Sequence, residues 1–290
     1  MRIQAVPAAI RASDGSQLTW LDTELVIRGA GAARGLGPAV AAALSPDGTR
    51  VATVRDGQVL DWDRSGAKGP RPAPPLPGVV DVAFDAAGRC LALARTPRGW
   101  MLAERSAPGS WTERFHGPGR PLGLGPVVAA GAAGYAPLAL AEGLAVLRFH
   151  APDPLLWWAG RAWPPELPPA LALDGGELVA VWTRRTRVGW RLMAAAHGPA
   201  RWPPHWVART VAEGVGSPLG AGAGTDPAHL WVLTDRGALR GPPAADPRWE
   251  HAPVERANGW EDRPQGRAPL RRTGDVDQVA PIRRASPERR

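Results

Sequence analysis

Tryptophan is the residue type whose number and spacing point most directly to a binding site in this chain. There are 14 tryptophans, against one tyrosine and three phenylalanines. An indole ring can stack on a flat ligand or fill an apolar contact while its N–H reaches a polar partner. Two groups of them lie in proline-rich stretches that we expect to form turns, so their rings should be exposed. The candidate binding residues are Trp157, Trp158, Trp163, Trp202, His205 and Trp206.

No spacing in the chain predicts a catalytic or metal site. The six histidines are never at metal-ligand spacing with Asp, Glu or Cys. Aspartates recur at Asp14, Asp47, Asp85 and Asp174, where a carboxylate that hydrogen-bonds the backbone of a turn explains them. The single cysteine, Cys90, rules out an internal disulfide, and its apolar neighbours indicate a buried thiol. We therefore predict no catalytic residue, no metal and no cofactor.

The stretch from Val40 to Asp63 shows which elements position these residues. Its first apolar run ends at the Ser-Pro-Asp-Gly turn of residues 45–48, which suits a tight reversal. Its second run ends at Asp56-Gly57, the strongest local signal for a two-residue hairpin. A third run, Gln58 to Trp62, then returns antiparallel. Three strands joined by two sharp turns predict one blade of a β-propeller.

The same pattern recurs along the chain. Successive hairpin turns are 34, 41, 45, 45 and 49 residues apart, steps that suit four-stranded blades. They are centred on Asp22, Asp56, Pro97, Glu142, Arg187 and Arg236. Outer fourth strands are predicted at residues 111–115, 206–210 and 249–254. The sequence thus predicts a single all-β propeller, with six four-stranded blades favoured, and it leaves open how the ring closes and whether there is a seventh blade.

We expect the propeller to occupy residues 1–256 and the remainder, 257–290, to form a disordered arginine-rich tail. The tail has charge, glycine and proline without a period. The formal net charge of the chain is +8, and nine arginines face five acidic residues from Arg256 onward. We expect no nucleic-acid partner, because acidic residues interrupt the basic ones. A weak electrostatic contact between the tail and nucleic acid is the alternative. The arginines concerned are Arg271, Arg272, Arg283 and Arg284. No signal peptide or membrane span is predicted, so we expect a cytoplasmic protein with no membrane partner.

The Ser-Pro-Asp-Gly turn and the Val-Leu-Asp-Trp-Asp ending of residues 59–63 resemble the WD-repeat family and its bacterial relatives, mainly over residues 40–103. The Gly-His pair that opens a regular WD repeat is missing, and Trp62-Asp63 is the only WD dipeptide. The resemblance implies the propeller fold and a role as an interaction platform. The chain is also similar to bacterial propellers that accompany MoxR-type ATPases and von Willebrand A proteins. That similarity implies a conflict, defence or signalling system with an ATPase.

Two functions are open. The first is a non-enzymatic scaffold that binds another protein, because the repeats come with no catalytic constellation. The alternative is a carbohydrate-binding lectin, because six-bladed fucose lectins place a tryptophan in each blade to stack on sugar rings. Tryptophans that fill the space between neighbouring sheets would account for many of the 14 without any ligand.

Overall fold

Every regular element in the computed structural model is a β-strand. The structure describes residues 9–11, 17–21, 24–28, 34–63, 71–105, 110–130, 132–150, 153–161, 165, 169–174, 177–187, 189–197, 206–215, 218–223, 230–234, 237–241 and 250–252. These residues contain no helix long and apolar enough to cross a membrane. Their strands form six antiparallel sheets, which we number blades 1 to 6 in chain order.

In every blade but blade 4, strands that follow one another in the chain lie next to one another. Blade 1 consists of β1 (Ala9–Arg11), β2 (Gln17–Leu21), β3 (Glu24–Arg28) and β4 (Arg34–Pro38). Blade 2 consists of β5 (Ala41–Leu44), β6 (Arg50–Arg55), β7 (Gln58–Asp63) and β8 (Arg71–Pro72). Blade 3 consists of β9 (Val79–Phe84), β10 (Cys90–Thr96), β11 (Gly99–Arg105) and β12 (Thr112–Gly117). Blade 4 consists of β13 (Pro121–Leu124), β14 (Val128–Ala130), β15 (Ala133–Leu140), β16 (Gly143–Phe149) and β17 (Leu155–Arg161). Blade 5 consists of β18 (Ala170–Asp174), β19 (Glu177–Arg185), β20 (Gly189–His197) and β21 (Val207–Val215). Blade 6 consists of β22 (Pro218–Ala223), β23 (Leu230–Thr234), β24 (Gly237–Gly241) and β25 (Glu250–Ala252).

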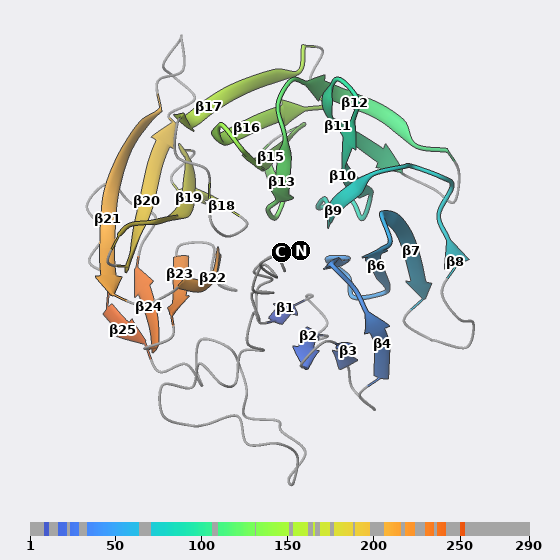
Figure 1. Ribbon diagram of the computed structural model, residues 1–290, viewed down its shortest axis with the longest axis horizontal. Helices are drawn as coiled ribbons and strands as arrows, with labels where there is room; N and C mark the ends of the chain where they lie inside the picture. Colours follow the sequence, from blue (N-terminus) through green and yellow to red (C-terminus); the bar gives the residue numbers. More distant parts are fainter. Residues whose placement is uncertain are drawn as a thin grey trace, which may run out of the picture.

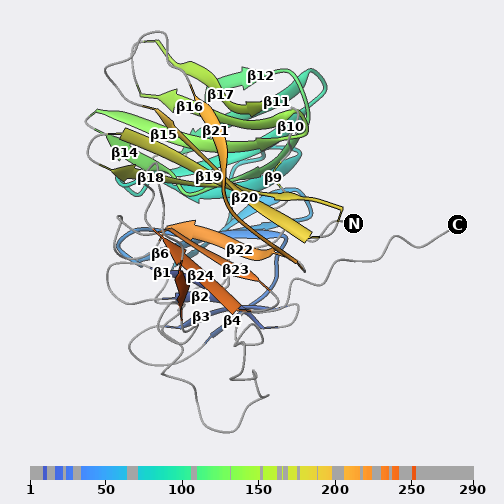
Figure 2. The ribbon, with the colours of Figure 1, turned by 90° about the vertical axis from the view of Figure 1, so that its left-hand side faces the viewer.

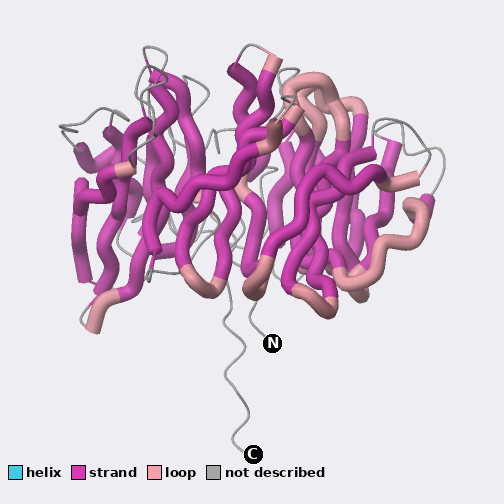
Figure 3. Tube along the Cα trace, turned by 90° about the horizontal axis from the view of Figure 1, so that it is seen from above, coloured by secondary structure: helices cyan, strands magenta, loops and turns pink. Residues whose placement is uncertain are grey.

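The blades stand around a common axis (Figure 1). Their first strands contact one another in chain order, from β1 and β5 through β9 and β13 to β14, β18 and β22. The last strand of each blade lies at the outer rim (Figure 1). Seen edge-on, the strands run through the thickness of a disk (Figure 3), and blades 4, 5 and 6 follow one another along its side (Figure 2). The chain therefore has the predicted β-propeller fold.

The described residues form six sheets, and the number of blades in the whole ring stays a prediction. The predicted tail, residues 257–290, lies outside the described residues, as do Arg271, Arg272, Arg283 and Arg284. The division at residue 256 therefore stays a prediction.

The turns of blades 2 and 3 have the predicted chemistry. Asp56 and Gly57 join β6 to β7 with φ angles of 50° and 73°, both positive as a type I′ hairpin requires. Asp47 Oδ1 accepts a hydrogen bond of 3.1 Å from the backbone N–H of Thr49. Asp85 Oδ1 accepts backbone hydrogen bonds of 3.0 and 2.8 Å within its own turn. The role predicted for Asp47 and Asp85, as acceptors for a turn backbone, is confirmed.

Blade 4 departs from the four-stranded pattern. Its inner edge is divided into β13 and β14, which both pair with β15. Gly125, Pro126 and Val127 separate the two strands, and the N–H of Gly125 still donates to the carbonyl of Pro137 at 2.9 Å. Blade 4 also has an outer strand, β17, in a stretch that the sequence pattern assigns to a turn.

The apolar core lies in the seams between neighbouring blades. One cluster of buried side chains joins blades 1 and 2, and others join blades 2 and 3, blades 3 and 4, and blades 4 and 5. Trp100 and Trp182 are completely buried there, and Trp62 is nearly so, while Trp190 is buried against Gly214 of its own blade. The explanation of tryptophans as packing between sheets is confirmed for Trp62, Trp100 and Trp182.

Two of these tryptophans pack on a glycine of the neighbouring strand. Trp100 on β11 pairs with Gly117 on β12, and Trp190 on β20 pairs with Gly214 on β21. A Cβ atom at Gly117 would lie 2.7 Å from the Trp100 ring, and one at Gly214 would lie 2.8 Å from the Trp190 ring. Blades 3 and 5 thus repeat one contact, in which the missing glycine side chain makes room for an indole.

Candidate functional site

The outer strand of blade 4 is the part of the described surface best suited to meet another molecule. β17 pairs with β16 on its inner side, and no described strand pairs with its outer side. An edge strand presents unpaired backbone N–H and C=O groups along its length. The sequence of β17, Leu-Leu-Trp-Trp-Ala-Gly-Arg, has no charged residue before Arg161. Its outer side is therefore a row of backbone hydrogen-bonding groups flanked by apolar side chains.

The other described outer strands have features that discourage pairing with a further strand. Natural sheets protect exposed edges with charges, prolines or very short strands. β8 is two residues long and contains Pro72, and β4 ends at Pro38. The sequences of β12, β21 and β25 contain the charged residues Glu113, Arg114, Arg209, Glu213 and Glu250. β17 has a bulge at Ala159 and a charge at Arg161, so residues 155–158 are the part that lacks such protection.

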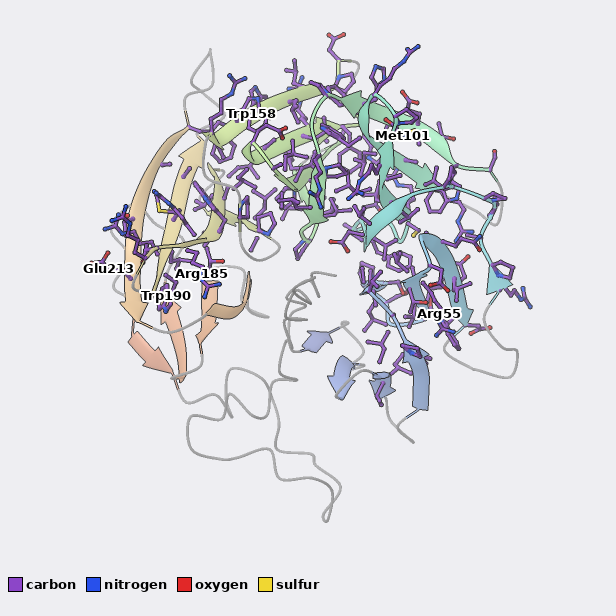
Figure 4. The ribbon with its side chains drawn as sticks, viewed as in Figure 1. Arg55, Met101, Trp158, Arg185, Trp190 and Glu213 are labelled. Carbon is purple, nitrogen blue, oxygen red and sulfur yellow. The ribbon has the colours of Figure 1, made fainter. Side chains whose placement is uncertain are left out.

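Trp157 and Trp158 lie on opposite faces of β17. Trp157 stacks on Tyr135 with ring centroids 6.4 Å apart, and the Arg148 guanidinium lies 5.8 Å from the Trp157 ring. Trp158 packs against the cluster between blades 3 and 4, and the Arg161 guanidinium lies 5.0 Å from its ring. Figure 4 shows Trp158 at the outer side of blade 4. An arginine therefore covers each indole.

The expectation that this pair lies in a proline-rich turn is wrong. Both residues belong to a strand, in which successive side chains point to opposite faces. Trp157 and Trp158 consequently form two separate half-buried sites in place of one exposed cluster.

The structure places Trp206 near the Trp157 side of blade 4. Trp206 precedes β21 and packs, half-buried, against the cluster between blades 4 and 5, as Tyr135 does. Trp163, Trp202 and His205 lie outside the described residues. A binding role for the predicted residues stays a prediction.

A network of charged side chains joins blades 3 and 4. Glu104, on β11, is 2% exposed and forms a two-pronged ion pair with Arg114, at 3.0 and 3.1 Å. Its Oε2 also accepts a hydrogen bond from Nε2 of His150, which follows β16 in blade 4. Arg89 lies between Asp85, at 2.6 Å, and Nδ1 of His150, at 2.9 Å. One carboxylate thus binds groups from both blades.

The partners of His150 determine which of its ring nitrogens carries the proton. A guanidinium can only donate, so Nδ1 must accept from Arg89 and the ring proton must lie on Nε2, where it faces Glu104. Both ring nitrogens and both Glu104 oxygens are thereby engaged. His150 has a φ of 61°, an unfavourable value for a side-chain-bearing residue that these hydrogen bonds help to hold. In this arrangement the network acts as a clamp between blades.

The ionisation of Glu104 follows from the same contacts. Burial raises the pKa of this carboxyl, but the hydrogen bonds from Arg114 and His150 and the charge of Arg114 outweigh burial and hold the pKa below its ordinary value of 4.5. Glu104 is therefore an ionised acceptor at neutral pH.

Blades 2 and 3 have a second clamp. The guanidinium of Arg105, 2% exposed, forms an ion pair with the carboxylate of Asp61 on β7. It also lies 5.0 Å from the ring of Trp111, whose Nε1–H donates to the carbonyl of Pro74 at 2.9 Å. Asp61 and Pro74 are residues of blade 2 and its outer connection, so Arg105 and Trp111 tie blade 3 to both.

Asp81 joins the innermost strands of blades 3 and 4. It lies on β9, is buried, and accepts 2.8 Å hydrogen bonds from the backbone N–H groups of Val82 and of Leu124 on β13. Burial raises the pKa of Asp81 to about 7, although these two bonds favour the ionised form. A carboxylate in the apolar run Val-Val-Asp-Val-Ala-Phe was the sequence signal for this contact.

The described residues hold no group of three or more His, Cys, Asp and Glu side chains that could bind a metal ion. Cys90 is completely buried, as expected, and burial raises the pKa of its thiol to about 12.

Comparison with known proteins supports the fold. No protein-family model matches the chain, and no curated protein matches its sequence. Among solved structures, the chain is similar to a streptogramin B lyase, with a TM-score of 0.62, 10% identity and coverage of 86% of this chain and 83% of the lyase. It is also similar to virginiamycin B lyase from Staphylococcus aureus, with a TM-score of 0.61, 11% identity and coverage of 88% and 87%. A third similar structure is the Cps50 (Swd1) β-propeller domain from Myceliophteria thermophila, with a TM-score of 0.53, 13% identity and coverage of 87% and 89%. These likenesses establish a β-propeller and do not single out the WD-repeat family.

Proposed function

We propose that this chain is a non-enzymatic β-propeller scaffold that binds another protein through the outer edge of β17. The observation that carries the proposal is the contrast between β17 and the other described outer strands, which are short or contain charges or proline. An extended segment of a partner can add to such an edge. Its backbone would supply affinity, and pockets on the two faces would supply specificity.

The side chains beside β17 suit this role. Trp and Arg are the residues that most often dominate the binding energy of protein interfaces. Here Trp157 lies under Arg148 on one face, and Trp158 lies under Arg161 on the other. A partner strand would meet one such pair on each face of the blade.

The two charged contacts between blades, Glu104 with His150 and Arg105 with Asp61, support a scaffold function more than a catalytic one. Glu104 contacts His150 across the seam between blades 3 and 4, and Arg105 contacts Asp61 across the seam between blades 2 and 3. They hold neighbouring blades in fixed positions, and a rigid frame lowers the ordering cost of binding. A bacterial defence or signalling system with an ATPase remains our expectation for the setting.

The alternative function, a carbohydrate-binding lectin, now depends on fewer residues. Trp62, Trp100, Trp182 and Trp190 are buried and are not available to stack on a sugar. The lectin hypothesis is left with the half-buried tryptophans and with those outside the described residues.

Affinity purification from the native host tests the proposed function. Leu155→Glu places a charge on β17 opposite Arg148, where it also finds an opposite charge within the blade. Val40→Glu is the matched control, because Val40 is the exposed large apolar residue of the described part and precedes β5, in blade 2. We expect Leu155→Glu to reduce recovery of a specific partner at least tenfold, while Val40→Glu retains it. Recovery of the same proteins with both variants would contradict the proposal.

A further inference from the structure

The two ends of β17 carry opposite charges. Asp153 is exposed and lies two residues before the strand, and Arg161 is exposed and is its last residue. No ion pair within the described residues uses either side chain. The backbone of Asp153 is held in place, since its carbonyl accepts a 3.1 Å hydrogen bond from Arg148. The edge therefore has an acidic start and a basic end.

This polarity makes β17 complementary to itself in one orientation. If two copies of the strand pair antiparallel, the acidic start of each lies beside the basic end of the other. Parallel pairing would instead bring like charges together. An antiparallel pair of identical strands is related by a two-fold axis, so the contact between the two ends would occur twice. The bulge at Ala159 brings Arg161 one position nearer the axis, where it lies beside Pro154 and Asp153 of the other copy.

The apolar side chains match in the same orientation. A two-fold axis at Trp157 places this residue opposite Trp157 of the other copy, and places Leu156 opposite Trp158. Residues opposite one another in an antiparallel pair share a face of the sheet, and Leu156 and Trp158 both pack on the seam between blades 3 and 4. Aromatic pairs and aromatic–aliphatic pairs across strands stabilise a sheet.

We propose that β17 pairs antiparallel with β17 of a second copy of this chain, so that the two fourth blades form one continuous sheet. The inference rests on the proposed function for the location of the binding edge and names a second copy as its occupant. The opposite edge of blade 4, formed by β13 and β14, faces the centre of the ring. The pairing uses the one outward edge of each blade, so it closes as a dimer and does not continue into a filament.

Sedimentation equilibrium of the full chain tests this inference. At concentrations up to about 100 µM, we expect the mass to approach twice the 30.6 kDa of the chain. Leu155→Glu should be monomeric, because an ionised carboxylate on this edge would lose its water against the apolar strand of the other copy. Val40→Glu, with the same change outside the edge, should dimerise as the wild type does.

A charge exchange tests the orientation of the pair. Asp153→Arg and Arg161→Asp should each weaken the dimer about tenfold, because each replaces two attractive contacts with repulsive ones. The double variant, Asp153→Arg with Arg161→Asp, restores opposite charges and should return the dissociation constant to within about twofold of the wild type. Thermal melting of all variants checks that the fold is kept.

Two results would overturn the inference: a wild-type chain that stays monomeric, or a dimer that Leu155→Glu and Asp153→Arg leave unchanged. If the wild type is monomeric but Leu155→Glu still loses a host partner, the dimer is wrong and the proposed function stands. If the wild type is a dimer that Leu155→Glu disrupts, and no host protein depends on Leu155, the dimer is supported and the proposed function is wrong.

Discussion

His150 and Glu104 join blades 3 and 4 through a hydrogen bond between Nε2 and Oε2. Glu104 lies on β11 and His150 directly follows β16, and the two residues are 46 positions apart. This hydrogen bond stabilises the contact between the two blades in addition to apolar burial. If the blades moved apart, the buried carboxylate of Glu104 would lose a partner, which is costly.

The clamp should therefore contribute much more to stability than an exposed ion pair does. Glu104→Gln keeps the shape of the side chain and removes its charge from Arg114 and His150. We expect this variant to melt about 5 to 10 °C below the wild type. Glu213→Gln is the control, since Glu213 is 64% exposed and its pair with Arg191 lies at the rim of blade 5 (Figure 4). This control should melt within about 2 °C of the wild type. Equal effects of the two changes would contradict the clamp.

The contribution of Glu104 should disappear in acid. Its pKa is lower in the folded chain than the ordinary 4.5, so the folded state binds the proton less tightly than the unfolded state does. The stabilisation is present above about pH 4.5 and is lost as the pH falls through the folded-state pKa. Melting of wild type and Glu104→Gln between pH 7 and 3 should show the difference shrinking in acid. A constant difference would be inconsistent with this account.

Asp81 should show the opposite pH dependence. Burial raises its pKa from 3.8 to about 7, so the folded state binds the proton more tightly than the unfolded state does. The free energy of unfolding should fall by about 1 kcal/mol for each pH unit between 4 and 7 because of this group. Asp81→Asn lacks the titration and keeps one acceptor for the N–H of Leu124. Denaturant unfolding at pH 5, 6 and 7 should show the wild type losing stability relative to Asp81→Asn. A difference that is independent of pH would show that Asp81 does not titrate in this range.

The contact between Trp100 and Gly117 should appear as coupling in a double-mutant cycle. Gly117→Ala is expected to cost about 1 to 3 kcal/mol, because the new Cβ lies 2.7 Å from the indole. In a Trp100→Leu background, which copies the Leu144 and Gly160 pair of blade 4, most of that cost should vanish. Gly88→Ala, with no atom near its Cβ, serves as the control and should cost the same in both backgrounds. Strict additivity of Gly117→Ala and Trp100→Leu would refute the contact.

Cys90 should be inert in the folded chain. Its thiol is buried and has a pKa raised to about 12, so almost no thiolate exists at pH 8. A coloured disulfide reagent should react only after denaturant unfolds the chain. Rapid reaction under native conditions would mean that the seam between blades 2 and 3 opens readily.

The sequence predicted the turns of this fold better than its outer strands. Asp56-Gly57 identifies its hairpin because few residues adopt positive φ twice in succession. β17 was missed, because Leu-Leu-Trp-Trp does not alternate in polarity and Pro154 directly precedes it. The strand is recognisable only once β16 is beside it, since both of its faces are partly buried against other blades.

The clamp residues were missed for a different reason. Arg89, Glu104, Arg114 and His150 come from two blades, so no short spacing brings them together in the sequence. Their pairing depends on the register of β11 with β12 and on the approach of blade 4. Both are tertiary features, and the pattern of polar and apolar residues within a single strand does not predict them.

The measurement that tests the central claim most directly is site-specific photo-crosslinking in the native host. A benzophenone amino acid at Leu155 samples whatever pairs with the outer edge of β17, and one at Val40 samples an exposed apolar position in blade 2. We predict a discrete covalent adduct from position 155, with another protein or with a second copy of the chain, and none of that size from position 40. No adduct at position 155, or the same adducts at both positions, would contradict the assignment of β17 as the binding edge.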